Sequence, residues 1–192
     1  MEKAIPNCNG ANGRSSSLQV ILSGVGGQGL MLAGKLLGAA ATGHEGKNAV
    51  MTSVYGVETR GTFTKSDVII CSGEIDYPEV LKADVVIALA PVAYKKYADS
   101  LHEGAMLIYD DAIEARECKA RQLGFPITKI AKEAGSTAMV NIVALGALVK
   151  LTGIVNEQSV KSAIEEEFQG KEKLIVSNLK ALQGGLEAAA GK

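Results

Sequence analysis

The sequence predicts an α/β domain of the three-layer, Rossmann-like kind: a mostly parallel sheet with helices on both faces and a helical C-terminal third. Short β-like runs alternate with helical patterns through residues 18–130, and several runs are apolar throughout, as in parallel strands buried on both faces. Aromatic residues make up 4% of the chain and Trp is absent, so Val, Ile, Leu and Ala must build the core.

The first part of the domain is expected to form a strand, a turn, a helix and two further strands. Residues 18–22 are an apolar run that glycines follow at once, and residues 30–41 then place Leu, Ala and Lys at helical spacing. Residues 47–54 and 63–71 are β-like runs on either side of a polar turn at residues 56–61. This segment should begin the sheet and lay its helix across one face.

The middle of the chain alternates between strands and short helices. Residues 84–90 (DVVIALA) and 105–109 have the composition of buried strands, and residues 125–130 predict a further short strand. A proline near its first turn predicts a short helix at residues 78–83, and residues 94–101 are also expected to be helical.

The C-terminal third changes character and predicts three helices that must pack on the sheet. Residues 138–151 are nearly all apolar but too short to cross a bilayer, and they contain Asn141. A buried Asn must be hydrogen-bonded, so this side chain should specify a contact. Residues 156–168 start with Asn156 as an N-cap candidate, and residues 171–190 are amphipathic.

Composition limits the domain organisation and the classes of partner. Residues 1–17 are rich in Asn, Gly and Ser and predict a flexible leader, followed by a single domain at residues 18–192. The net charge is −1 with scattered Lys and Arg, which argues against nucleic acid and membrane surfaces as partners. The chain lacks a secretory signal, so a cytoplasmic location is expected.

The cysteines and histidines do not predict a metal site. Cys8, Cys71 and Cys118 are far apart and form no C-x-x-C pair, which is typical of reduced thiols and excludes a four-cysteine iron–sulfur cluster held by this chain alone. His44 and His102 have no partner at metal-ligand spacing.

The glycine-rich turn GVGGQG lies between the first strand and the first helix. Glycines permit positive φ and close backbone approach, and the following helix N-terminus can hold an anion, so the turn could cradle a pyrophosphate. A strand–helix turn that needs small residues only for packing explains the same pattern. A true dinucleotide site would need an acid at the end of the second strand, and none is there. The candidate binding residues of the turn are Gly24, Gly26, Gly27, Gln28 and Gly29.

A second polar segment, YGVETRG, follows the end of the second strand. Its candidate binding residues are Tyr55, Glu58, Arg60 and Gly61. Arg60 could grip a phosphate or a carboxylate as a planar fork. A hairpin turn with Glu58 and Arg60 merely solvated remains an equal alternative.

The other polar positions are interpreted as helix caps. Asp111 of the Asp110–Asp111 pair is expected to cap a helix at Ala112 rather than bind a metal, and Ser136 precedes the apolar helix as another cap. The chain has no nucleophile elbow, no P-loop and no Cys/His pair, so no catalytic residue is assigned.

The order of these pieces resembles a known family. After GVGGQG and YGVETRG come SDVI at residues 66–69, ADVVIAL at residues 83–89 and NIVALG at residues 141–146. Together they are similar to the gamma-type subunits (the catalytic domain family) of the 2-oxoacid:ferredoxin oxidoreductases, over about residues 18–185.

The resemblance implies an oxidoreductase subunit that is inactive alone. Such enzymes decarboxylate a 2-oxoacid oxidatively, form an acyl-CoA and pass electrons to ferredoxin. Thiamine diphosphate, Mg²⁺, iron–sulfur clusters and coenzyme A are expected in the assembled complex, with none bound by this chain alone. The expected partners are alpha, beta and delta subunits in one hetero-oligomer. The favoured substrate is 2-oxoglutarate, with pyruvate and 2-oxoisovalerate as rivals.

Carried over onto this chain, the family's glycine turn falls on residues 24–29 and its E-x-R-G-G loop begins at Glu58. Both are expected to face the CoA cleft or partner subunits. Thr62 replaces the second glycine of that loop, and Ile69 stands where the family often has Arg. The alternative function is a stand-alone dinucleotide-binding oxidoreductase that uses the GVGGQG turn.

Overall fold

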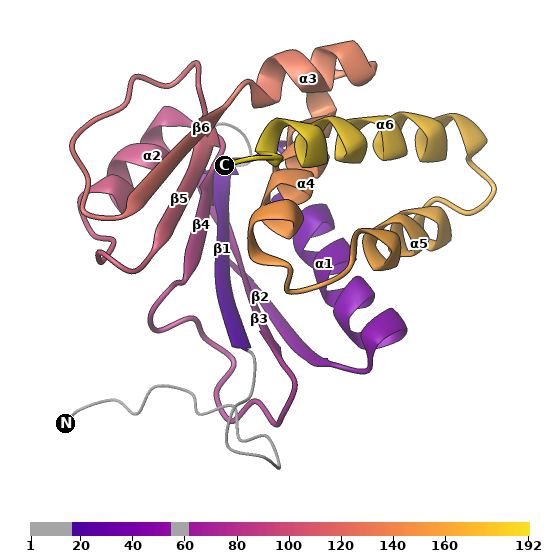
Figure 1. Ribbon diagram of the computed structural model, residues 1–192, viewed down its shortest axis with the longest axis horizontal. Coiled ribbons are helices and arrows are strands. Elements are labelled where there is room, and N and C mark those ends of the chain that lie inside the picture. The colour runs from indigo at the N-terminus through magenta and orange to yellow at the C-terminus, as the bar shows by residue number, and fades with distance from the viewer. Residues whose placement is uncertain (1–16, 55–61) are drawn as a thin grey trace.

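The computed structural model describes residues 17–54 and 62–192, which build one mixed sheet and the helices that cover it. Figure 1 shows the strands side by side with most of the helices to one side. The strands of the described residues are β1 (Ser17–Val25), β2 (Asn48–Val54), β3 (Phe63–Cys71), β4 (Val85–Ala88), β5 (Met106–Asp110) and β6 (Arg121–Phe125).

The strand order is β2-β3-β1-β4-β5-β6. Strands β1, β4, β5 and β6 run parallel, whereas β3 is antiparallel to both β1 and β2. A mostly parallel sheet is therefore confirmed, with an antiparallel pair added at one edge.

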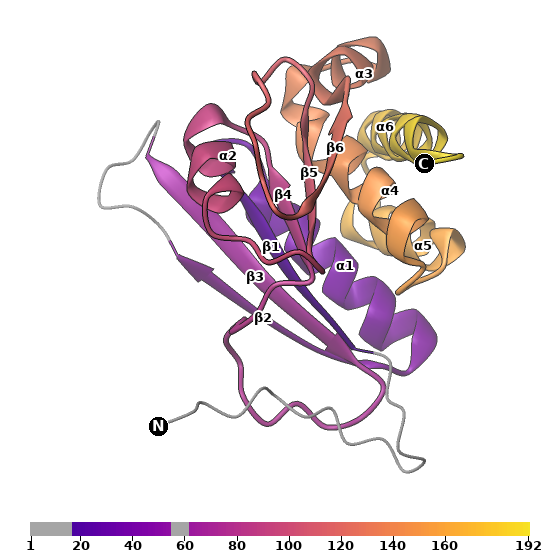
Figure 2. The same cartoon turned by 60° about the vertical axis from the view of Figure 1, so that its left-hand side comes forward.

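The helices cover the two faces unequally. They are α1 (Leu30–Glu45), α2 (Pro91–Ala98), α3 (Ile127–Ala134), α4 (Val140–Thr152), α5 (Glu157–Glu167) and α6 (Glu172–Ala189), with a short 3-10 helix η1 (Thr137–Met139). Figure 2 shows α2 on one side of the sheet and α1, α4, α5 and α6 on the other. The predicted three-layer α/β class with a helical C-terminal third is confirmed.

Side chains that alternate in direction along each strand divide the hydrophobic core between the two faces of the sheet. In β1, Val20 and Leu22 pack in the large cluster beneath α1 and α4, whereas Ile21 belongs to the smaller cluster beneath α2. Because successive side chains of a strand point to opposite faces, apolar runs such as that of β4 can serve both clusters at once.

The nearly all-apolar helix α4 is enclosed by the sheet on one side and by α6 on the other. A Cβ on Gly146 or on Gly185 would overlap the backbone of the facing helix. The two helices therefore approach closely enough to exclude any larger residue at this crossing, which explains why α4 is buried nearly all round.

Two of the predicted elements are wrong. Residues 78–83 form bends rather than a helix, because the Leu81 N–H donates to the Gln19 side chain and the Gln19 N–H donates to Asp84, so this segment is bound to β1. Residues 125–130 are not a strand: β6 ends at Phe125 and α3 begins at Ile127. Ile127, Ala131 and Ala134 are buried at helical spacing, and that pattern prevails over the β-like composition.

In the part of the chain that the structure describes, no helix is both long enough and apolar enough to span a bilayer.

Candidate functional site

The glycine turn lies at the carboxyl edge of the sheet, where β1 ends and α1 begins. The connection from β1 uses helix α1 on one face, and the connection from the neighbouring β4 uses α2 on the other. Such a switch point leaves a crevice outside the strand ends, where ligands of open α/β sheets bind. The Gly26 N–H donates to the Thr62 carbonyl at 3.1 Å, which ties the turn to the start of β3.

Gln28 holds the turn closed from within. Its Oε1 accepts from the Val25 N–H at 2.8 Å, and its Nε2 donates to the Leu89 carbonyl beyond β4, also at 2.8 Å. A Cβ on Gly24 would collide with the Gln28 amide, so these two residues fit each other. The side chain of Gln28 thus links the ends of two parallel strands.

Two glycines of the turn adopt backbone conformations that disfavour other residues. Gly27 has φ +97° and Gly29 has φ +69°. Gly29 is the N-cap of α1, and no side chain caps this helix start. The first N–H groups of a helix have no intrahelical acceptor, so the start of α1 offers donors and a partial positive charge.

Asn141 reaches Gly29 from α4. Its Nδ2 donates to the Gly29 carbonyl at 2.9 Å, across 112 residues of sequence. A Cβ on Gly29 would lie 2.5 Å from that Nδ2. The expectation that a buried Asn141 specifies a contact is confirmed, and the contact is the N-cap of α1.

Two hollows flank the glycine turn. The β3-side hollow, about 320 Å³, is lined by residues 25–31 together with Thr64 and Lys65. The α3-side hollow, about 440 Å³, is lined by residues 26–28, Thr128, Thr137, Ala138 and Val140. The second hollow therefore brings the first turns of α3 and α4 next to the turn that starts α1.

Asp110, at the end of β5, caps α3. Its carboxylate accepts from the Ala112 N–H at 3.0 Å and from the Thr128 N–H at 2.7 Å, and the Thr128 hydroxyl also donates to it. The predicted cap at Asp111 is wrong, because Ala112 lies in a turn rather than a helix and Asp111 is exposed. The carboxylate offsets the positive end of α3, whereas no side chain caps the start of α1.

The two other predicted caps have different outcomes. The Ser136 Oγ accepts from the Ala138 N–H at 3.1 Å, so this cap is confirmed, on η1. Asn156 is the N-cap residue of α5, but its side chain makes no capping bond. Its N–H instead donates to Glu45 Oε1 at 2.5 Å.

Tyr55, Glu58, Arg60 and Gly61 lie outside the described residues. The residues that flank this segment are Val54, at the end of β2, and Thr62, which accepts from Gly26. Both therefore lie at the carboxyl edge near the glycine turn, and the roles of the four candidates remain predictions.

Sequence reasoning missed a charged cluster on the α2 side of β3. Asp67 is 4% exposed and pairs with Lys65 at 2.5 Å. Burial, and then the charge of Asp67, raise the pKa of Tyr97 to about 12. Phe63 packs against Tyr97 with 6.3 Å between ring centroids, and Lys96 lies 4.0 Å above the Phe63 ring. No sequence spacing would have joined α2 to β3 in this way.

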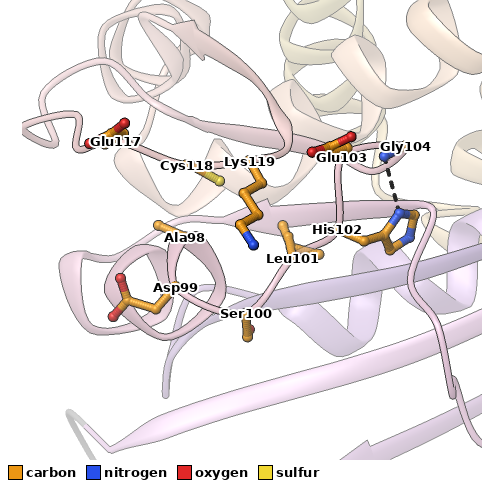
Figure 3. A pocket seen from close by; sticks show the side chains of 10 residues that line it. All are labelled: Ala98, Asp99, Ser100, Leu101, His102, Glu103, Gly104, Glu117, Cys118 and Lys119. Atoms are coloured by element: carbon orange, nitrogen blue, oxygen red, sulfur yellow. Dashed lines mark hydrogen bonds between the residues drawn. The ribbon is translucent and has the colours of Figure 1, made fainter.

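A larger hollow lies at the opposite, amino edge of the sheet, and Figure 3 shows its lining. This amino-edge groove, about 1010 Å³, is lined by residues 98–104 and 117–119. Lys119 extends into its middle, with Asp99 and Glu117 to one side and Glu103 to the other.

The polar groups of the amino-edge groove do not form a reaction centre. His102 Nδ1 accepts from the Gly104 N–H at 3.1 Å and its Nε2 lies 3.2 Å from the Ala83 carbonyl, so both ring nitrogens are engaged. Cys118 is a free thiol. Within residues 17–54 and 62–192, no group of three His, Cys, Asp or Glu residues could hold a metal ion.

The sheet order is unlike that of a dinucleotide-binding fold. There, the second strand lies beside β1 and parallel to it, and its end presents the acid that binds ribose. Here the antiparallel β3 takes that place, and β2 is displaced to the edge. The glycine turn therefore has no ribose-binding strand end next to it.

Comparison with known proteins gives one consistent result. Residues 19–188 match the family described as pyruvate ferredoxin/flavodoxin oxidoreductase. The chain is 40% identical over 177 residues to 2-oxoglutarate synthase subunit KorC of Methanocaldococcus jannaschii, covering 89% of this chain and 93% of that protein.

Two solved structures share the fold. The keto/oxoacid ferredoxin oxidoreductase gamma subunit from Geobacter sulfurreducens superposes with a TM-score of 0.78 at 36% identity, covering 91% of this chain and 99% of the other. The 2-oxoglutarate:ferredoxin oxidoreductase from Magnetococcus marinus, with 2-oxoglutarate, coenzyme A and succinyl-CoA bound, gives 0.83 at 26% identity, over 92% of this chain and 31% of the other. The predicted resemblance is confirmed: the chain belongs to the pyruvate ferredoxin/flavodoxin oxidoreductase family, as a gamma-type subunit of the 2-oxoacid:ferredoxin oxidoreductases.

Proposed function

We propose that this chain is the gamma subunit of a 2-oxoglutarate:ferredoxin oxidoreductase and that its glycine-turn edge forms part of the coenzyme A side of the active site. The enzyme would decarboxylate 2-oxoglutarate oxidatively and transfer the succinyl group to the CoA thiol, with the electrons going to ferredoxin. KorC of Methanocaldococcus jannaschii, similar over nearly its whole length, supports the choice of 2-oxoacid.

The observation that carries the CoA role is the glycine turn at the switch point of the sheet. Its flanking hollows are lined by the first turns of α1 and α4, and no side chain caps the start of α1. Backbone N–H groups and helix dipoles of this kind favour a diphosphate. A solved relative that contains bound coenzyme A has the same fold at a TM-score of 0.83, which is consistent with this assignment.

The residues that would hold the anion are those of the turn. Gly27 lines both hollows and Gly29 lines the β3-side hollow, while Gln28 fixes the turn between β1 and β4. We further propose that Arg60 and Glu58 of the adjoining polar segment face the same cleft or a partner subunit, since Thr62, which directly follows that segment, contacts the turn.

The chain has no reaction centre of its own in this proposal. Alpha, beta and delta subunits would supply thiamine diphosphate, Mg²⁺ and iron–sulfur clusters, and ferredoxin would bind to the complex. We place the assembly in the cytoplasm. The native complex, purified through a tag on this chain, should contain these partners and turn over 2-oxoglutarate faster than pyruvate or 2-oxoisovalerate.

The CoA role is tested in the assembled enzyme with Gly27→Ala. The new side chain meets nothing within 4 Å, but φ +97° disfavours it, so the turn must shift. Gly43→Ala is the matched control, because Gly43 lies in α1 and a Cβ there also meets nothing within 4 Å.

Gly27→Ala should raise the KM for CoA and the calorimetric Kd for CoA about tenfold, with the KM for 2-oxoglutarate unchanged. Equal KM and Kd values for CoA in Gly27→Ala, Gly43→Ala and the parent enzyme would refute the CoA role.

Arg60→Ala in the same assays tests the polar segment. An unchanged KM for CoA and unchanged turnover would show that Arg60 has no role in CoA binding or catalysis. Binding of NAD, NADP or FAD by the isolated chain would favour a stand-alone oxidoreductase instead.

A further inference from the structure

Asn141 is an exception within the apolar helix α4. It lies in the first turn of α4, where Val140 to Val149 are all buried, and it is the polar residue of that stretch. It is 3% exposed. A polar side chain in such a position lowers stability unless its hydrogen bonds are made.

Only half of the Asn141 amide is satisfied. Nδ2 donates to the Gly29 carbonyl at 2.9 Å, but Oδ1 is one of two buried side-chain polar atoms in the described residues that have no hydrogen-bond partner, the other being Asp67 Oδ1. A side chain kept only for packing would be an apolar residue of similar size, which would leave no orphaned acceptor.

The contact fixes the start of α1. The Gly29 carbonyl that receives the Asn141 hydrogen bond also accepts the first helical bond, from the Ala33 N–H at 3.1 Å. The Asn141 amide fills the space that a Cβ on Gly29 would occupy. One side chain on α4 therefore sets where the N-cap of α1 lies, and with it the direction of the N–H groups that follow.

The position of Asn141 also joins the two hollows. Its neighbour Val140 lines the α3-side hollow, and its partner Gly29 lines the β3-side hollow. We propose that Asn141 is a positioning residue for coenzyme A: it holds the glycine turn in the conformation that binds the diphosphate, and it does so through Gly29. This inference rests on the proposed CoA role of the turn.

Asn178 provides a matched control. It is also a buried Asn in a C-terminal helix, 5% exposed, but its Nδ2 donates to the Leu174 carbonyl within its own helix. Leu at either position removes an amide of similar size and one hydrogen bond. Only Leu at position 141 should affect the glycine turn.

The assembled enzyme should be compared as parent, Asn141→Leu, Asn178→Leu and Gly27→Ala. We expect Asn141→Leu to raise the calorimetric Kd and the KM for CoA about tenfold, with kcat within twofold and the KM for 2-oxoglutarate unchanged. Asn178→Leu should leave all of these unchanged. Amide hydrogen exchange of residues 26–33 should be faster in Asn141→Leu before CoA is added. If the Leu variant does not assemble, Asn141→Ser, which shortens the side chain but stays polar, replaces it.

The outcomes separate the two proposals. An unchanged Kd in Asn141→Leu with a raised Kd in Gly27→Ala would overturn the positioning role and leave the CoA role standing. Equal losses of CoA affinity in Asn141→Leu and Asn178→Leu would also overturn it, because they would indicate a general loss of packing. An unchanged Kd in both Gly27→Ala and Asn141→Leu would remove the CoA role itself, and the inference with it.

Discussion

The two edges of the sheet differ in how their hollows are built. The amino-edge groove has about 1010 Å³, roughly three times the volume of the β3-side hollow, yet exposed loop side chains line most of it. The carboxyl edge has smaller hollows, but Gln28, Asp110 and Asn141 each bind one element there to another that is distant in sequence. A binding site needs backbone groups held in fixed positions, and these three side chains hold such groups at the carboxyl edge.

The comparison predicts that the anchors of the carboxyl edge control stability strongly. The largest effect is expected for Asp110→Ala, which removes three hydrogen bonds to a buried carboxylate and leaves the start of α3 uncapped. We expect a loss of about 3 kcal/mol in the free energy of unfolding, measured by urea denaturation. Asp111→Ala should change it by less than about 0.5 kcal/mol, because Asp111 is exposed. Similar losses in the two variants would refute the assignment of the cap.

Gly29→Ala should have the next largest effect. Alanine at φ +69° is strained, and its Cβ would meet the Asn141 amide at 2.5 Å. Gly46→Ala separates these causes, because Gly46 has φ +63° with nothing within 4 Å of a Cβ. We expect the free energy of unfolding, measured by thermal or urea denaturation, to fall by about 1 kcal/mol in Gly46→Ala and by about 2–3 kcal/mol in Gly29→Ala. CoA binding should be weaker in Gly29→Ala alone. If the two variants lose the same free energy of unfolding, the overlap with Asn141 does not contribute to the loss in Gly29→Ala.

Glu45 lies at the end of α1 that is far from the glycine turn. A substitution there tests whether a contact at the opposite edge of the sheet affects stability without affecting CoA binding. Burial would raise the pKa of its carboxyl group, but hydrogen bonds from Lys47, the Asn156 N–H and Ser159 outweigh this and hold the pKa below the usual 4.5. A lowered pKa means that the carboxylate stabilises the fold above pH 4.5 and that this contribution is lost as pH falls through the folded-state pKa.

Glu45→Gln should therefore lower the free energy of unfolding by about 1 kcal/mol at pH 7. The difference in this free energy between Glu45→Gln and the parent should become smaller below pH 4.5. Urea denaturation at pH 7 and pH 4 measures both. Glu157→Gln is the control, since Glu157 pairs with Lys150 at 2.9 Å but both side chains are about 40% exposed. A difference that stays constant with pH would contradict the account, as would weaker CoA binding in Glu45→Gln.

The smallest effect is expected in the amino-edge groove. Lys119→Ala removes the side chain that extends into its middle. The free energy of unfolding should change by less than about 0.5 kcal/mol, and the KM for CoA should stay within twofold. A large rise in that KM would reverse the comparison and make the larger groove the CoA site.

Local structure could be predicted from the order of residues alone. The apolar runs of β4 and β5, the change to helical spacing after Gly29 and the long apolar run around Asn141 are properties of neighbouring residues, so they could be predicted from spacing alone. The GVGGQG turn could be placed between a strand and a helix for the same reason. Residues 125–130 show the limit, since a short apolar stretch suits either a strand or a helix start.

Which elements lie against each other depends on long-range packing. That β3 lies antiparallel between β1 and β2 depends on how strands pair across the whole sheet. That Asp110 caps α3, and that Asn141 fixes Gly29, depends on packing between residues 18 and 112 positions apart. Such contacts form because burying apolar faces brings distant backbone groups together, and buried polar groups must then find partners where the fold has placed them.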